Sequence, residues 1–332
     1  MAGILGLMAA FWLGGQYLRV PVRLRWAMIG LLWAAVVAVQ LLLPAGHPLR
    51  EATGGRAETW LVLLGLVLLV AGYRAGLRRL RARVGKGPVA APSGAFRPAE
   101  LDRYARHIML REIGGPGQRR LRDAGFRVVG AGGLGAPVLL YLAGAGVGCI
   151  GVIDDDVVDN SNLQRQVIHT DDRIGMAKVH SAALMMRALN PFIEVRPFQR
   201  RLDEGIAAQL FADYDLILDG SDNFDTRYLV NRVAARLGKP LISAAITQWE
   251  GQISLYDPGA GGPCYECVFP VRPAPGLVPS CAEAGVVAPL PGVIGALMAL
   301  ETVKHLTGAG EGLRGRLMIF DGLYGESRVI GV

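Results

Sequence analysis

Charged residues are scarce in this chain. Asp, Glu, Lys and Arg make up 19% of its 332 residues, 52% are hydrophobic, and the mean hydropathy is +0.34. That balance is too apolar for an ordinary soluble protein, in which about 25% of the residues are charged. The length leaves room for one large or two ordinary domains and an additional apolar segment.

Cysteine is also rare, with four residues in the whole sequence: Cys149, Cys264, Cys267 and Cys281. Small extracellular proteins that depend on disulfides carry a much denser set of cysteines. The sequence therefore excludes a disulfide-stabilised scaffold.

Acidic residues are nearly absent from the first 90 residues, which hold 11 Lys and Arg but only 2 Asp and Glu, a net charge of +9. The remainder holds 35−11 = 24 basic and 28−2 = 26 acidic residues, a net charge of −2. The near-neutral larger part argues against nucleic-acid binding. A membrane surface is the better partner for the basic part.

Three apolar stretches lie in this basic part, at residues 2–18, 26–43 and 59–73. A membrane-spanning helix needs about 20 apolar residues, so the first two stretches are long enough and the third is marginal. Arginines between the first two stretches and after the third predict an outer N-terminus and a C-terminal domain on the cytoplasmic face of the inner membrane. The alternatives are a buried helical bundle or a signal peptide, although the chain lacks the basic start of a signal peptide.

The region after the apolar stretches reads as a linker, because residues 85–98 are rich in Gly, Pro and Ala. We therefore expect a membrane segment at residues 1–84 with two or three transmembrane helices. The linker follows at 85–98, and a folded domain covers residues 99–332.

A glycine-rich turn marks the start of that domain. A short apolar run at residues 126–129 precedes the sequence GAGGLG at 130–135, and an apolar helical stretch follows to about residue 146. A second apolar run at 149–153 ends in Asp154, Asp155 and Asp156. This order is typical of a nucleotide-binding βαβ unit, in which glycines let the backbone approach phosphates and an acid accepts ribose hydroxyls. The turn alone favours a nicotinamide enzyme over an ATP-binding one.

The rest of the domain alternates strand and helix patterns. Further strands are expected at residues 216–218, 241–243, 253–256 and 317–320, and helices at 175–190, 225–237 and 293–306. The alternation predicts an α/β fold with a doubly wound, mostly parallel sheet, to which the later strands add an antiparallel part.

Four further motifs are specific when taken together: RYARHIML at 103–110, SNLQRQ at 161–166, GMAK at 175–178 and DGSDNFDTR at 219–227. In this order and spacing the sequence resembles the MoeB/ThiF/HesA family, the bacterial relatives of ubiquitin-activating enzymes. The resemblance runs from about residue 100 to 321. It implies adenylation, with release of pyrophosphate, of the C-terminal glycine of a ubiquitin-like sulfur-carrier protein.

The residue types suit that chemistry. Arg106, Arg165 and Lys178 are three cations on separate segments, able to clamp a triphosphate. Asp222 follows a strand and can hold Mg²⁺. The alternatives are a surface ion pair for Lys178 and a helix N-cap for Asp222. The resemblance implies that ATP is contacted by Gly133, Asp154, Asp156, Ser161, Asn162, Leu163, Gln164, Arg165, Lys178, Asp222 and Asn223.

The resemblance also implies a homodimer, because Arg106 in this family reaches the active site of the neighbouring subunit. Cys264 and Cys267 form a CxxC that supplies half of a structural zinc site in the family. The second pair expected after Cys281 is absent from this sequence, so we do not expect zinc. Cys281 aligns with a cysteine that some relatives use for a covalent link to the carrier, and is a candidate for that role.

Several alternatives stay open. The chain could activate another carboxylate, such as that of a modified tRNA base, or act as a membrane-tethered nucleotide-binding protein without turnover. No sulfurtransferase domain follows in the sequence, so a separate sulfur donor protein is expected. Molybdopterin synthesis is the favoured pathway, with thiamine synthesis or another thiolation route as the alternative.

Overall fold

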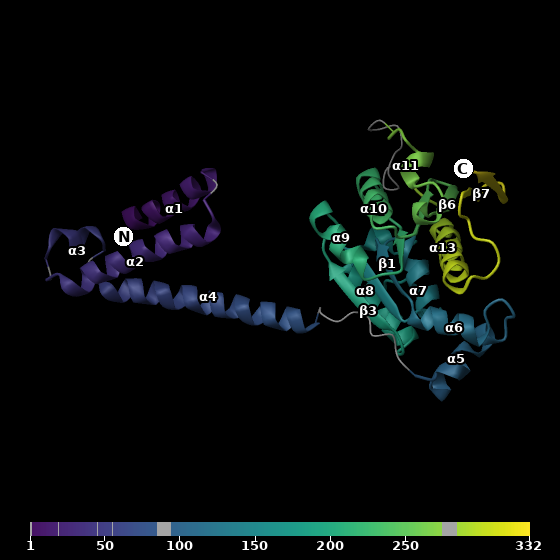
Figure 1. Cartoon of the computed structure of the whole chain (residues 1–332), viewed down its shortest axis with the longest axis horizontal. Helices are drawn as coiled ribbons and strands as arrows, with labels where there is room; N and C mark the ends of the chain where they lie inside the picture. Colours follow the sequence, from purple (N-terminus) through teal and green to yellow (C-terminus); the bar gives the residue numbers. More distant parts are fainter. Residues whose placement is uncertain (1, 19, 45, 55, 85–93, 274–283) are drawn as a thin grey trace. The chain divides into compact units, whose positions relative to one another are not determined.

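The computed structural model describes residues 2–18, 20–44, 46–54, 56–84, 94–273 and 284–332 (Figure 1). The chain divides into two compact units, Met1–Gly87 and Pro88–Val332. Each unit is described by itself.

The N-terminal unit is helical: α1 (Ala2–Tyr17), α2 (Val22–Leu42), the short α3 (Pro48–Ala52) and α4 (Ala57–Val84). Two of its buried polar side chains, Gln40 and Trp60, form hydrogen bonds where α2 turns into α4. Gln40 donates to the Arg50 carbonyl at 2.8 Å and to Thr53 Oγ1 at 2.6 Å. The fully buried Trp60 donates to the Thr53 carbonyl at 3.0 Å. These bonds close the helical hairpin by satisfying polar groups that would otherwise be stranded among apolar side chains.

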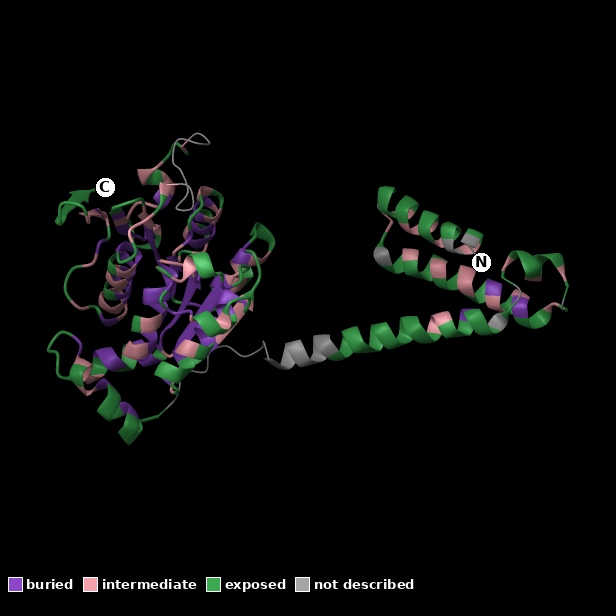
Figure 2. Ribbon diagram, turned by 180° about the vertical axis from the view of Figure 1, so that it is seen from behind, coloured by how far each residue is buried: buried purple, intermediate pink, exposed green. Residues whose placement is uncertain are grey.

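Two helices in the described part of this unit have the length and composition to cross a membrane. They are Arg23–Leu42 and Glu58–Gly76, each with a mean hydropathy of 1.7. Figure 2 shows that α4 is exposed along most of its described length. The first apolar stretch forms α1, which has 16 residues and is shorter than a typical span.

The second unit is built on one eight-stranded sheet with the order β3-β2-β1-β4-β5-β6-β7-β8. The first five strands in that order are parallel and the last three are antiparallel, which confirms the predicted doubly wound fold with an antiparallel addition. The strands are β1 (Gly125–Val129), β2 (Cys149–Asp154), β3 (Glu194–Gln199), β4 (Leu216–Asp219), β5 (Leu241–Ile246), β6 (Glu250–Tyr256), β7 (Arg316–Asp321) and β8 (Glu326–Gly331).

Helices cover both faces of the sheet and bury two apolar cores (Figure 2). One core involves α6 (Gly114–Asp123), α7 (Gly135–Ala145), α8 (Lys178–Leu189) and α13 (Leu290–Thr307). The other involves α9 (Glu204–Ala212), α10 (Phe224–Arg236) and the short α11 (Tyr265–Val268). Helix α5 (Pro98–Ile108) precedes the sheet and packs on α6.

Three elements differ from the sequence expectation. The helix expected from residue 175 begins at Lys178, because Gly175 has φ +85° and Ala177 forms a bridge with Val157. Strand β3 contains Pro197, which argues against a central strand but is tolerated because β3 lies at the sheet edge. Strand β8 is exposed at every position, so no hydrophobic alternation predicts it.

Candidate nucleotide-binding site

The glycine turn lies between β1 and α7, at the carboxyl ends of the parallel strands. Gly130 has φ +95°, a conformation that favours glycine. A Cβ at Gly135 would lie 2.0 Å from the Gly130 carbonyl oxygen, so this position admits only glycine. At Gly133 a Cβ would approach Pro291 to 3.2 Å, which shows that the start of α13 closes against the turn.

Asp154 ends β2 and holds the turn in place. Its carboxylate accepts hydrogen bonds from the Ala131 N–H at 2.7 Å and the Asp156 N–H at 2.9 Å. Burial raises the pKa of Asp154, against the opposing effect of these two N–H donors. Because β2 and β4 flank β1 on opposite sides, Asp154 lies beside the point where the sheet reverses its winding, the usual ligand position in such folds.

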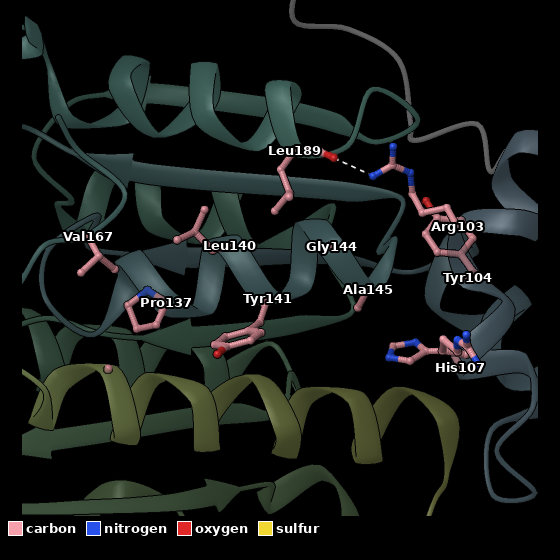
Figure 3. A pocket seen from close by; sticks show the side chains of 12 residues that line it. Arg103, Tyr104, His107, Pro137, Leu140, Tyr141, Gly144, Ala145, Val167 and Leu189 are labelled. Carbon is pink, nitrogen blue, oxygen red and sulfur yellow. Dashed lines mark hydrogen bonds between the residues drawn. The ribbon is translucent and has the colours of Figure 1, made fainter.

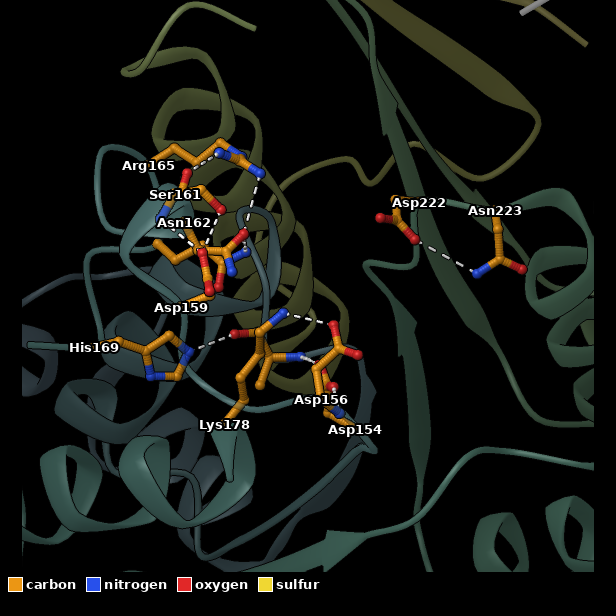
Figure 4. A network of polar contacts seen from close by, with 12 residues as sticks. Asp154, Asp156, Asp159, Ser161, Asn162, Arg165, His169, Lys178, Asp222 and Asn223 are labelled. Atoms are coloured by element: carbon orange, nitrogen blue, oxygen red, sulfur yellow. Dashed lines mark hydrogen bonds and ion pairs between the residues drawn. The ribbon is translucent and has the colours of Figure 1, made fainter. Parts of the chain in front are cut away.

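Lys178 opens α8 and pairs with the second acid of the β2 cluster. Its Nζ lies 2.8 Å from Asp156 Oδ2, and the lysine N–H also donates to the Asp156 carbonyl at 3.0 Å. The lysine side chain is buried, whereas the carboxylate is largely exposed (Figure 4). Lys178 therefore does form an ion pair, as one interpretation of the sequence expected. Its side chain is buried, however, and does not lie on the surface.

The SNLQRQ segment forms a short 3₁₀ turn, η1 (Asn160–Asn162), with Leu163 as its C-cap and Gln164 exposed. Asp159 caps this turn by accepting from the Ser161 N–H at 2.8 Å and hydroxyl at 2.6 Å. Arg165 donates to the Ser161 carbonyl at 3.1 Å and to Asn162 Oδ1 at 3.3 Å. The turn thereby sets the position of the Arg165 guanidinium (Figure 4).

A second set of residues follows β4. The buried Asp219 accepts from the Ser221 N–H at 3.0 Å and from the Ser243 hydroxyl at 2.8 Å. Its Oδ2 also lies 3.6 Å from Arg227 Nε, and Arg227 donates to the Ser221 carbonyl at 2.9 Å. These bonds fix the loop that presents Asp222.

Asp222 itself is exposed, and its neighbour Asn223 performs the capping. Asn223 accepts from the Thr226 N–H at 2.9 Å and is the N-cap of α10. The N-cap interpretation of Asp222 is therefore wrong, and its carboxylate is available to a ligand (Figure 4).

Arg106 is placed apart from these residues. It lies on α5, whose neighbouring side chains Arg103 and Tyr104 bond to the end of α8 and to Asn190. Arg106 lines a groove of about 730 Å³ that runs along the outer side of α7 (Figure 3). Its apolar lining includes Leu140, Tyr141 and Val167, of which the last two are exposed.

The cysteines are accounted for in part. Cys264 Sγ lies 3.3 Å from Cys267 Sγ at the start of α11. Burial acts to raise the pKa of Cys264, but hydrogen bonds, chiefly with Cys267, outweigh it and lower the pKa. Asn231 Nδ2 lies 3.8 Å from Cys264 Sγ. Within the described ranges, neither cysteine belongs to a group of three or more candidate metal ligands. Cys281 lies outside the described residues.

Sequence reasoning missed three buried polar residues of the site. His169 bonds to the glycine turn, while Asp219 and Arg227 brace the Asp222 loop. Asp219 and Arg227 lie within a quoted motif, whereas His169 lies outside the motifs and carries no pattern of its own. Their burial was not readable from the sequence, because polar residues are mostly exposed.

This arrangement fits a nucleoside triphosphate. The glycine turn leaves room for phosphates, and Lys178 and Arg165 provide cations on two separate segments. Gln166 has a buried Oε1 that meets no partner among the described residues, and its Nε2 lies 3.5 Å from where a Gly132 Cβ would be. Asp222 and the acids 154–156 offer oxygen ligands suited to Mg²⁺.

Comparison with known proteins identifies relatives of this chain. The chain is 50% identical over 224 residues to the SAMP-activating enzyme of Haloferax volcanii, covering 68% of this chain and 82% of that protein. It is 49% identical over 237 residues to the sulfur carrier protein adenylyltransferase of Thermus thermophilus, covering 70% and 88%.

Solved structures share the fold at lower identity. PaaA matches with a TM-score of 0.63 at 23% identity, covering 89% of each chain. MccB of E. coli with ATP matches with a TM-score of 0.60 at 22% identity, covering 90% of this chain and 86% of that one. The ThiF family model matches residues 104–331, which is more than half of the sequence. The chain therefore belongs to the ThiF family.

Proposed function

We propose that this protein is an adenylyltransferase that uses ATP to activate the C-terminal glycine of a ubiquitin-like sulfur-carrier protein, in molybdopterin synthesis or a related thiolation pathway. The observation that carries the proposal is the combination of the glycine turn, the buried Lys178 and the braced Asp222 loop at the carboxyl ends of the parallel strands. A chain 49% identical to this one carries the name sulfur carrier protein adenylyltransferase.

The reaction needs little chemistry from the protein. A C-terminal carboxylate is already ionised at neutral pH, so it can attack the α-phosphorus without a general base. The bond to the pyrophosphate oxygen breaks, and an acyl-adenylate forms. Lys178 and Arg165 would stabilise the charge that develops on the phosphates, while Asp154 would accept the ribose hydroxyls. Mg²⁺, held by Asp222, would neutralise phosphate charge.

The active unit we propose is a homodimer. Arg106 lines the same groove as Gly144 and Ala145, which lie at the opposite end of α7 from the glycine turn. An arginine in this position is better placed to serve a neighbouring subunit than its own site. The exposed Tyr141 and Val167 along the groove supply apolar surface for such a contact.

We further propose that the N-terminal unit anchors the enzyme in the cytoplasmic membrane, with the catalytic unit in the cytoplasm. Two observations support this. The first is the pair of candidate spans. The second is the position of the arginines at the start of the first span and at the end of the second, the two ends that face the cytoplasm in this orientation: residues 23, 25, 74, 78, 79, 81 and 83. Full-length protein should stay in the membrane fraction after alkaline carbonate extraction. Release into the soluble fraction would contradict the anchor.

Exchange of radiolabelled pyrophosphate into ATP tests the activity. Full-length protein in detergent should catalyse exchange only when a ubiquitin-like carrier ending in Gly-Gly is present. The same carrier without its last glycine is the matched control. The proposal would be overturned if no ubiquitin-like carrier of the source cell supported pyrophosphate exchange. If tRNA supported the exchange and bound in a salt-sensitive way, the substrate would be a nucleic acid and not a carrier protein.

A further inference from the structure

His169 is a buried imidazole that connects two parts of the nucleotide site. It is 5% exposed, with Nε2 2.9 Å from the Ala131 carbonyl oxygen and Nδ1 2.9 Å from Ser181 Oγ. Ala131 belongs to the glycine turn, and Ser181 lies in the first turn of α8, three residues after Lys178. One side chain therefore joins the phosphate-binding turn to the helix that carries the phosphate-binding lysine.

The two contacts fix the tautomer. A carbonyl oxygen only accepts, so Nε2 carries the hydrogen and donates to Ala131. Nδ1 then accepts from the Ser181 hydroxyl. The neutral ring satisfies both partners at once. Burial lowers the pKa of His169, and the neighbouring Lys178 and Arg173 act in the same direction, which keeps the ring neutral.

Ala131 is consequently held through both of its backbone groups. Its N–H donates to Asp154 at 2.7 Å, and its C=O accepts from His169 at 2.9 Å. Ser181 is held in turn, because Arg173 donates to its carbonyl at 3.2 Å. Without His169 the Ala131 carbonyl would lose its buried donor, and a buried acceptor left unpaired is costly.

We propose that His169 is a positioning residue for ATP, which sets the separation between the glycine turn and Lys178. The inference rests on the proposed function, and it concerns the nucleotide half of that site alone. His169 acts through the Ala131 carbonyl and Ser181, so its loss weakens ATP binding and leaves the binding of the carrier unchanged.

Three variants of the full-length protein test this. His169→Phe keeps the ring shape and removes both hydrogen bonds. His169→Gln keeps an N–H near the position of Nε2, where it can donate to the Ala131 carbonyl. Ser181→Ala removes only the hydroxyl donor. The dissociation constant for ATP is measured by calorimetry in detergent without any carrier, and the KM values for ATP and for the carrier come from pyrophosphate exchange.

The phenylalanine variant should bind ATP about tenfold or more weakly, because the glycine turn and Lys178 would no longer be held at the separation that the phosphates need. His169→Gln should stay within about threefold of the wild type, Ser181→Ala should lie between them, and the KM for the carrier should not change. Equal losses in the Phe and Gln variants, or unchanged ATP binding in the Phe variant, would overturn the inference. If the Phe variant fails to fold, the Gln and Ser181→Ala comparison decides. Wild-type protein that binds ATP but exchanges with no carrier would reject the proposed function and leave this comparison valid.

Discussion

The ion pair between Lys178 and Asp156 is buried on one side only: the Nζ–Oδ2 distance is 2.8 Å, and the side chains are 6% and 66% exposed, respectively. The lysine is held in place while its carboxylate partner faces solvent, so incoming phosphates can take over as the partner. Lys178→Met should lower pyrophosphate exchange by about 100-fold or more, as the loss of one preorganised charge-stabilising group does.

The matched control is Lys239→Met. Lys239 lies in the turn before β5, at the amino end of that strand and thus away from the carboxyl ends where the site lies. It should leave exchange unchanged, and both variants should keep the circular dichroism of the wild type. A Lys178→Met protein with unchanged pyrophosphate exchange would show that Lys178 does not take part in the reaction.

Asp219 and Asp222 lie three residues apart and should respond to substitution in opposite ways. Asp219→Leu leaves the buried Arg227 guanidinium without its carboxylate partner, which typically costs about 3–5 kcal/mol. Asp222→Asn should change stability little, because the side chain is exposed, yet abolish exchange. Thermal unfolding and hydrogen exchange of residues 216–231 measure the first effect, and pyrophosphate exchange measures the second. Similar melting temperatures for both variants would contradict this assignment.

Much of the fold could be read from the sequence, because apolar runs bounded by glycines mark the central strands. Those strands, β1, β2, β4 and β5, are buried and carry a strong apolar signal. The edge strands β3 and β8 do not, since each pairs with only one neighbour and tolerates proline or polar residues.

The candidate site was predictable for the residues that we propose contact the nucleotide, and not for the residues that support them. Lys178 and Asp154 follow from the motifs. His169 carries no such signal, because its role depends on the Ala131 carbonyl 38 residues earlier, a contact that only the folded sheet creates.

Gly135 and Gly115 should also respond in opposite ways to alanine. A Cβ at Gly135 would lie 2.0 Å from a backbone oxygen that cannot move away, so Gly135→Ala should unfold the catalytic unit or abolish ATP binding. A Cβ at Gly115 meets no described atom within 4 Å, and the residue is helical. Gly115→Ala should therefore gain about 0.5–1 kcal/mol from helix propensity. Calorimetric unfolding compares the two, and a well-folded, ATP-binding Gly135→Ala protein would contradict the close approach.

Removing metal should not destabilise the catalytic unit. Tetrahedral structural zinc needs four ligands, and the described residues offer the pair Cys264 and Cys267 without a third. Extended dialysis against a chelator should leave the melting temperature unchanged, and elemental analysis should find less than one zinc per chain. Stoichiometric zinc, with a lower melting temperature after its removal, would show that Cys281 or another chain completes the site.

Acid should destabilise the catalytic unit through two histidines, the buried His169 and the half-buried His305. Burial lowers the pKa of His169 and of His305 in the folded state. The unfolded chain gains protons as the pH falls through about 6.5, whereas the folded imidazoles resist them. The unfolded state then binds more protons, so the free energy of unfolding decreases as the pH falls below this value. Burial raises the pKa of Asp154, which acts in the opposite direction at more acidic pH. The difference between wild type and His169→Gln therefore isolates one histidine. Melting temperatures measured from pH 8 to pH 5 should fall less steeply in the variant. Parallel curves would show that the pKa of His169 is not lowered in the folded protein.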